Sequence, residues 1–205
     1  MTNALVARKP WAKAEVITLA AVISLLLVLC LALPIATQNV TNNWYKNYNQ
    51  YLIGPVVNAS LIYAGLRLKK FYNVFGIVLL PSVCAATLGL IGINAVFLLY
   101  MVPIIWLGNM AIVLSFRFSF RNTSGLMRNK SMRFSLASVL GIGLKVTIIF
   151  CGFLILQNFG VFPTPVAEKL YTMMGVVQLI TATSGAIVAF GLIKLIPAKR
   201  QLQKI

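Results

Sequence analysis

Long apolar segments separated by short polar ones make up most of this sequence. Uninterrupted apolar stretches lie at residues 15–35, 71–91, 95–116, 132–157 and 166–196. Each reaches the roughly 18 residues that a helix needs to cross a bilayer. The pattern therefore predicts five transmembrane helices.

A sixth apolar segment, at residues 52–66, is shorter and begins with LIGPVVNASLIYAGL. Gly54-Pro55 is a signal for a helix start, because proline lacks a backbone donor that would be unpaired in a first turn anyway. Together the segments predict an all-α membrane protein, with one integral membrane domain of six transmembrane helices over residues 1–205.

Most charged residues lie in the polar segments between the apolar ones. The 205 residues include 18 Lys and Arg but two acidic residues, Glu15 and Glu168, so the net charge is +16. Lys46 and Lys169 lie on one side of the predicted membrane. Fifteen other basic residues lie on the opposite side: Arg8, Lys9, Lys13, Arg67, Lys69, Lys70, Arg117, Arg121, Arg128, Lys130, Arg133, Lys194, Lys199, Arg200 and Lys204. Cytoplasmic loops are enriched in Lys and Arg, so both termini are predicted to be cytoplasmic.

This placement of charge also bears on partners and location. Basic loops at the inner membrane face attract anionic lipid headgroups, so membrane lipids account for the charge and no nucleic-acid partner is expected. The N-terminus does not resemble a transit peptide, which favours the plasma membrane of a prokaryote.

The composition argues against catalysis and metal binding. The chain has no His or Asp, and its two glutamates are predicted at opposite membrane faces, which leaves no acid/base pair. Cys30, Cys84 and Cys151 lie in apolar segments without CxxC spacing and are interpreted as small buried thiols. We expect no enzymatic activity, no metal site and no cofactor.

Polar side chains inside the apolar segments are the candidate functional residues. Lys145 lies in LGIGLKVTIIF, about 12 residues and ~18 Å into its predicted helix. A lysine at that depth costs roughly 2.5–3.5 kcal/mol to insert, so a compensating group is needed. Asn58, Asn109, Gln178 and Thr181 are the other polar candidates. We predict that the five line a site for a small anionic or polar solute; the alternatives are hydrogen bonds between helices, or pairing of the lysine with an acid of a partner subunit.

Four stretches occur in an order and spacing that resemble a known family: GPVVNASLIYAGL, MVPIIWLGNMAIVL, the lysine of the fifth segment, and MMGVVQLITATSGAIVAF. The chain resembles S components of the energy-coupling-factor (ECF) transporters, closest to uncharacterised S-component-like proteins. The resemblance implies a six-helix membrane subunit that captures a vitamin, a vitamin precursor or a metal ion outside the cell. It also implies partners: a membrane coupling subunit and two cytosolic ABC ATPases.

The resemblance suggests roles for two further regions. The loop between the first two helices helps to close the site in this family, and here it reads TQNVTNNWYKNYNQY, in which Trp44 and Tyr48 can stack on or hydrogen-bond a solute. An interfacial aromatic belt is the alternative. Small residues spaced four apart on the first helix contact the coupling subunit; the corresponding pairs here are Ala14 with Thr18, and Ala20 with Ser24.

These observations favour the substrate-binding subunit of an ECF-type importer. A solitary transporter that works without ATPases would use the same site. The competing hypothesis is a membrane anchor or accessory subunit of a larger complex, for instance a redox complex, in which Lys145 pairs with an acid on a neighbouring chain.

Overall fold

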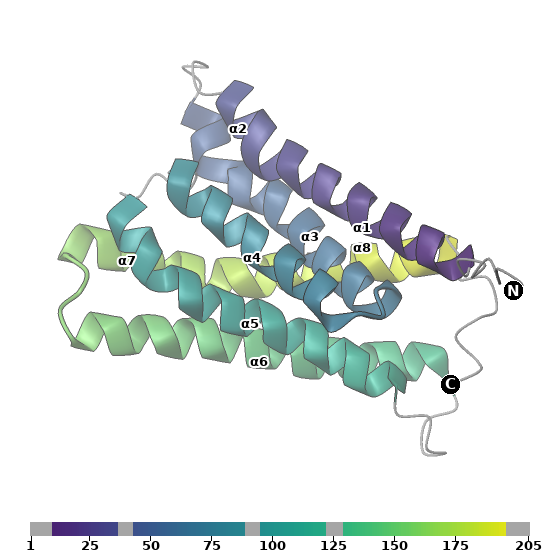
Figure 1. The fold of residues 1–205 in the computed structure, drawn as a ribbon. Coiled ribbons are helices and arrows are strands. Elements are labelled where there is room, and N and C mark those ends of the chain that lie inside the picture. The colour runs from purple at the N-terminus through teal and green to yellow at the C-terminus, as the bar shows by residue number, and fades with distance from the viewer. Residues whose placement is uncertain (1–9, 37–42, 89–94, 122–128, 196–205) are drawn as a thin grey trace, which may run out of the picture.

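The computed structural model describes residues 10–36, 43–88, 95–121 and 129–195, and this part of the chain is helical with no strand (Figure 1). The predicted all-helical fold is confirmed. The elements are α1 (Pro10–Leu27), the π-helical turn η1 (Val28–Ala32), α2 (Leu33–Ala36), α3 (Asn43–Arg67), α4 (Phe71–Leu88), α5 (Ala95–Arg121), α6 (Lys130–Asn158), α7 (Thr164–Thr172), the π-helical turn η2 (Met173–Val177) and α8 (Gln178–Leu195). Because η1 and η2 lie inside continuous helices, these elements form six helical segments.

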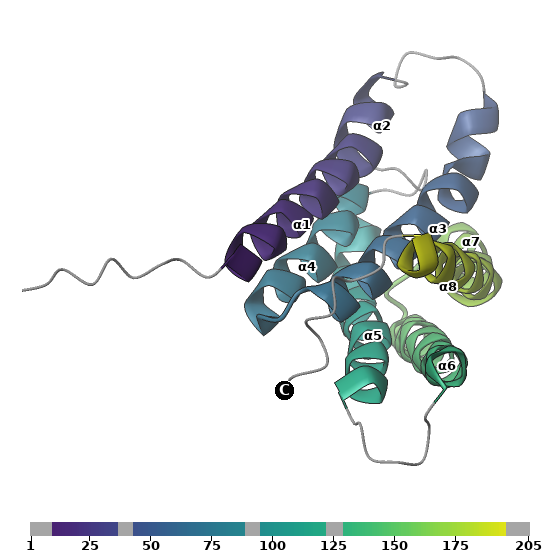
Figure 2. The same cartoon turned by 90° about the vertical axis from the view of Figure 1, so that its right-hand side faces the viewer.

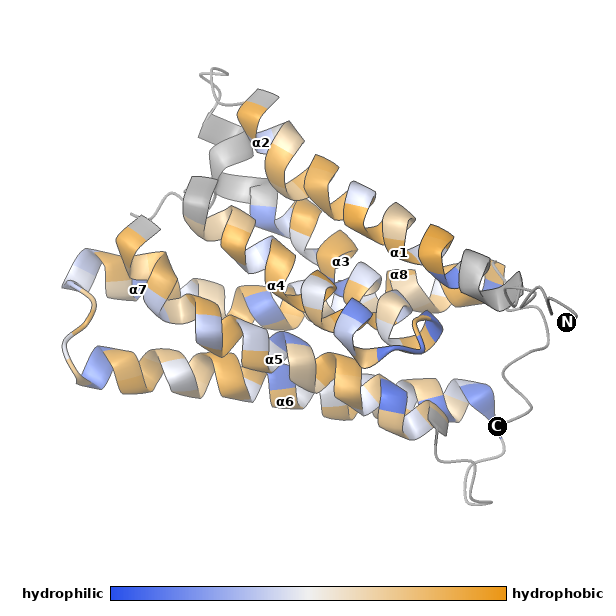
Figure 3. Cartoon of the chain, viewed as in Figure 1, coloured by the Kyte–Doolittle hydropathy of each residue, from blue (hydrophilic) through white to orange (hydrophobic). Residues whose placement is uncertain are grey.

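Four helical segments are long and apolar enough to cross a membrane: Glu15–Ala32, Val96–Phe120, Lys130–Asn158 and Thr164–Leu195. In α4 the apolar helix Phe71–Ala86 is shorter, and α3 begins with the polar stretch NWYKNYNQY. Apolar residues cover most of the long helices in Figure 3. These helices indicate a membrane-embedded protein. That all six segments cross the membrane stays a prediction.

The predicted start of the second segment is wrong. α3 begins at Asn43, and Pro55 lies inside the helix instead of in its first turn. A proline in a helix removes one backbone hydrogen bond and introduces a clash, and helices packed against it can compensate for that cost. Residues 43–51, predicted as part of a loop, form the first turns of α3.

Close helix contacts depend on small residues. A Cβ atom on Gly185 of α8 would lie 2.5 Å from Cβ of Asn58 and 2.8 Å from the carbonyl oxygen of Pro55 in α3. A Cβ atom on Gly108 of α5 would lie 2.6 Å from Cγ1 of Ile149 and 3.2 Å from the carbonyl oxygen of Lys145 in α6. Such contacts are typical of membrane helices, where small residues let backbones approach. They hold α3 against α8, and α5 against α6.

The loop between α3 and α4 is held from two sides. The Glu15 carboxylate of α1 accepts hydrogen bonds from the backbone N–H groups of Lys69, at 3.0 Å, and Lys70, at 3.1 Å. The Arg117 guanidinium of α5 donates to the carbonyl oxygens of Leu68, at 3.0 Å, and Lys69, at 2.6 Å. One end of α1, the α3–α4 loop and one end of α5 thus meet at the same end of the bundle.

The described parts of the first and last helices share that end. The start of α1 and the end of α8 lie at the same side in Figure 1, and Figure 2 shows the bundle from that side. Because α3 ends, α6 begins and α8 ends there, most of the described basic residues lie at this end: Arg67, Lys69, Lys70, Arg117, Lys130, Arg133 and Lys194. We call this the basic end.

Candidate ligand-binding site

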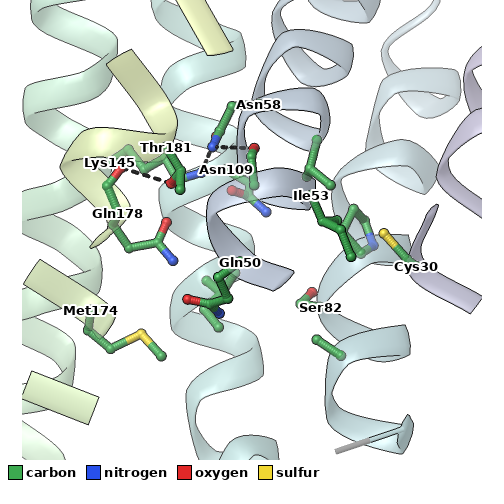
Figure 4. Close-up of a pocket in the computed structure, with 15 residues that line it drawn as sticks. Cys30, Gln50, Ile53, Asn58, Ser82, Asn109, Lys145, Met174, Gln178 and Thr181 are labelled. Atoms are coloured by element: carbon green, nitrogen blue, oxygen red, sulfur yellow. Dashed lines mark hydrogen bonds between the residues drawn. The ribbon is translucent and has the colours of Figure 1, made fainter. Parts of the chain in front are cut away.

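Five predicted site residues line one cavity inside the bundle. The cavity has a volume of about 120 Å³ and is bordered by Asn58 of α3, Asn109 of α5, Lys145 of α6, and Gln178 and Thr181 of α8 (Figure 4). These residues are far apart in the sequence and lie on four helices. The predicted convergence of the intramembrane polar residues on one cavity is present in the structure.

Lys145 is held by an amide at the cavity wall. Its side chain is 3% exposed, and its Nζ donates a hydrogen bond to Oδ1 of Asn58 at 2.5 Å. Asn58 in turn donates from Nδ2 to the carbonyl oxygen of Gly54 at 2.9 Å. An ammonium carries three donors, and Asn58 is its one hydrogen-bond partner among the described residues. The lysine is fixed in position with donor capacity left over.

Neither glutamate of this chain neutralises Lys145. Both acidic residues belong to the described part of the structure. Glu15 is bonded to the α3–α4 loop at the basic end, and Glu168 is exposed on α7. Glu168 precedes Gln178 of the cavity by ten residues, which is about 15 Å along a helix. The cavity is therefore electropositive and suited to an anionic group.

Asn109 and Gln178 bring amides with unused bonding capacity. Asn109 is 3% exposed, and its Oδ1 has no hydrogen-bond partner among the described residues. A buried polar atom without a partner costs about 1–3 kcal/mol and calls for an explanation. Gln178 is half-buried, and its amide points into the cavity in Figure 4. Both side chains can donate to and accept from a bound molecule.

Thr181 has a local role besides lining the cavity. Its Oγ1 donates to the carbonyl oxygen of Gln178 at 3.2 Å. Its side chain also fills the space beside Gly54, where an added Cβ atom would lie 2.7 Å from Cγ2 of Thr181. The hydroxyl is thus already bonded within α8, and the methyl group packs between α3 and α8.

Further cavity residues were not predicted, namely Cys30, Gln50, Ser82 and Met174. Two of them, Gln50 and Met174, could have been predicted from their spacing to other cavity residues, because residues four apart share a helix face. Gln50, Gly54 and Asn58 are spaced four apart on α3. Met174 precedes Gln178 by four. Gln50 was placed in a loop, and Cys30 and Met174 are apolar types that do not stand out in an apolar segment.

Irregular backbone surrounds the cavity. Cys30 belongs to η1, Met174 belongs to η2, and Pro81 of α4 lies inside its helix. Gly54, beside Pro55 of α3, also lines the cavity. π-Turns inside α-helices are frequent at functional sites, and broken helices in membrane proteins are tolerated where they line a cavity. The irregular turns support a binding function.

The two aromatic candidates are placed differently from the prediction. Trp44 and Tyr48 lie on the first turns of α3 and not in a loop. Their side chains lie outside what the structure describes, so their contact with a solute stays a prediction.

The predicted coupling residues of α1 do not form one surface. Ala20 and Ser24 are exposed, Thr18 is half-buried, and the side chain of Ala14 lies outside the described part. At about 100° per residue, the pair at 20 and 24 is rotated by roughly 120° from the pair at 14 and 18. The exposed pair lies on a face of α1 that also carries exposed apolar side chains such as Ile17 and Leu27.

The described residues contain no cluster of three or more His, Cys, Asp or Glu. Cys30 and Cys84 are buried as predicted, whereas the prediction is wrong for Cys151, which is exposed on α6.

Comparison with protein-family models, curated proteins and solved structures gives no match. The resemblance to ECF S components therefore rests on sequence motifs.

Proposed function

We propose that this chain is the substrate-binding subunit of an ECF-type importer, which captures a small polar or anionic solute outside the cell. The observation that carries the proposal is the buried Lys145, which is bonded to a neutral amide in a cavity without a carboxylate. No described residue at this depth balances its charge, and a bound anion would do so.

The roles within the cavity follow from the bonding. Lys145 attracts the negative group of the solute, and Asn58 holds the lysine in place. Asn109 and Gln178 orient the solute through amide hydrogen bonds. Met174 and Ile105 provide apolar wall against the remainder of the molecule.

The position of the cavity fits capture from the side opposite the basic end. Asn58 lies about 14 Å from Arg67 along α3, while Cys30 lies about 30 Å from the start of α1 at Pro10. The cavity extends from the middle of the bundle towards the other end. If the basic end is cytoplasmic, as the charge distribution predicts, the cavity extends outward.

The competing function, an anchor subunit whose Lys145 pairs with an acid of a neighbouring chain, has less support. Lys145 is enclosed by helices of its own chain and is 3% exposed. A neighbour's side chain would have to enter through the cavity to reach it. A small solute meets this constraint more easily than a side chain attached to another helix.

Gentle purification from the native membrane tests the proposed function. Mass spectrometry should identify a membrane coupling subunit with two ABC ATPases, a retained small molecule, or both. A solitary transporter would show the molecule without the ATPases. A stable set of redox subunits with no small molecule would overturn the proposal in favour of the anchor subunit.

A further inference from the structure

The charge in the cavity limits the charge of its ligand. Among the described residues that line the cavity, Lys145 is the one charged side chain. One negative charge on the ligand neutralises it, whereas a second would be left unpaired in an apolar surrounding, which is costly. A neutral ligand would leave the ammonium unbalanced. The charge count therefore favours a monoanion.

The free amide oxygen of Asn109 indicates what else the ligand carries. Oδ1 of Asn109 is an acceptor, is buried, and has no partner among the described residues. Oδ1 of Asn58 differs, because it already accepts from Lys145. A ligand with an N–H or O–H group close to its anionic group can bond Lys145 and Asn109 together. Gln50 also lines the cavity, and its amide oxygen Oε1 is a second buried acceptor without a partner among the described residues.

The volume limits the size of the ligand. The cavity volume is about 120 Å³. Cavities for drug-sized ligands measure roughly 300–1,000 Å³. The volume therefore favours a short-chain or single-ring compound over a multi-ring molecule.

Resting on the proposed function, we infer that the ligand is a small monocarboxylate with an adjacent O–H or N–H donor and a short apolar body. Its carboxylate accepts from Lys145, and its donor bonds Oδ1 of Asn109. The apolar body contacts wall residues such as Ile53, Ile105 and Met174.

A matched series of four-carbon compounds tests the inference with the full-length protein in detergent. The series is 2-hydroxybutyrate, butyrate without the donor, 2-hydroxybutyramide without the charge, and malate with a second carboxylate. Affinity is read from the shift of the thermal unfolding midpoint with concentration. We expect 2-hydroxybutyrate to bind about tenfold or more tightly than each of the others, because each lacks a charged or donor interaction or adds an unpaired charge.

A variant of Asn109 tests the hydrogen bond from the ligand's donor separately from the charge interaction with Lys145. Asn109→Leu keeps the size of the side chain and removes the amide, so it should bind 2-hydroxybutyrate and butyrate equally. The wild-type series decides the question alone if the variant fails to fold. Malate or the amide binding as tightly as 2-hydroxybutyrate would overturn the inference, and so would failure of the whole series to bind. A retained molecule of another class in the native preparation would overturn the inference while leaving the proposed function intact.

Discussion

At the scale of single residues, the bond between Lys145 and Asn58 determines the chemistry of the cavity. The ammonium receives an acceptor but no negative charge, because the amide is neutral. Its position is therefore fixed while its electrostatic field remains unbalanced. A carboxylate partner in the chain would have satisfied the lysine and removed the reason to propose an anionic ligand.

A double-mutant cycle tests this bond. Asn58→Ala should lower the free energy of unfolding by roughly 1.5–3 kcal/mol, because a buried charged donor loses its acceptor. In a Lys145→Met background the same change should cost less than about 1 kcal/mol, since there is no ammonium to satisfy. Equal costs in the two backgrounds, measured by reversible unfolding in detergent, would show that the bond contributes nothing.

The sequence revealed those site residues that differ chemically from their surroundings. Lys145, Asn58 and Asn109 are polar residues in apolar segments, and all of them reach the cavity. Gln50 has the same chemistry but lies in a polar stretch, where nothing sets it apart. Met174 lies in an apolar stretch and is equally inconspicuous. Contrast with neighbouring residues, and not residue type alone, decided what could be predicted.

At the scale of helices, the crossing of α3 and α8 positions the site. Gly185 of α8 lies against Asn58 and Pro55 of α3, and Gly54 of α3 lies against Thr181. The two helices approach closely at two points, and the bonded Asn58 lies at one of them. The distance between these helices therefore sets where Asn58 meets Lys145.

Two glycines of α8 offer a matched comparison. Gly185→Ala places a Cβ atom 2.8 Å from a backbone oxygen, so it should force the helices apart, lower stability by about 1–3 kcal/mol and weaken ligand retention. Gly191→Ala meets no atom within 4 Å and should be neutral or stabilising by up to ~1 kcal/mol. If the two variants have the same stability and retention, the tight crossing does not govern the site.

Helix boundaries were predicted less well than helix existence. Gly54-Pro55 resembles a start signal, but helices packed against α3 support a continuous helix from Asn43 through the proline. The turns η1 and η2 have no comparable sequence signal, since VLCLA and MMGVV are ordinary apolar sequences. Their conformation depends on packing between helices, which a single sequence does not report.

At the scale of the whole molecule, the bundle has two different ends. Most of the described basic residues gather at the end where Glu15 and Arg117 hold the α3–α4 loop, whereas Lys145 lies in the cavity and Lys169 lies on α7. The cavity extends towards the other end. The positive-inside rule predicts that the basic end is cytoplasmic, which would place the cavity on the side from which an importer takes its solute.

Labelling in intact cells tests this orientation. Single cysteines at Ser131, near the basic end, and at Thr164, at the other end, are introduced after replacing Cys30, Cys84 and Cys151. A membrane-impermeant maleimide should label Thr164→Cys from outside, and Ser131→Cys after the cells are permeabilised. The opposite pattern would place the cavity towards the cytoplasm and contradict import.

The most direct test of the central claim, that Lys145 holds a small anion, is the amount of small molecule retained per mole of purified protein. Mass spectrometry would compare the wild type with Lys145→Met and with the control Lys130→Met, which changes an exposed lysine of the same helix. We predict equal retention by the wild type and the control, and at least about tenfold less by Lys145→Met. Undiminished retention by folded Lys145→Met would contradict the account.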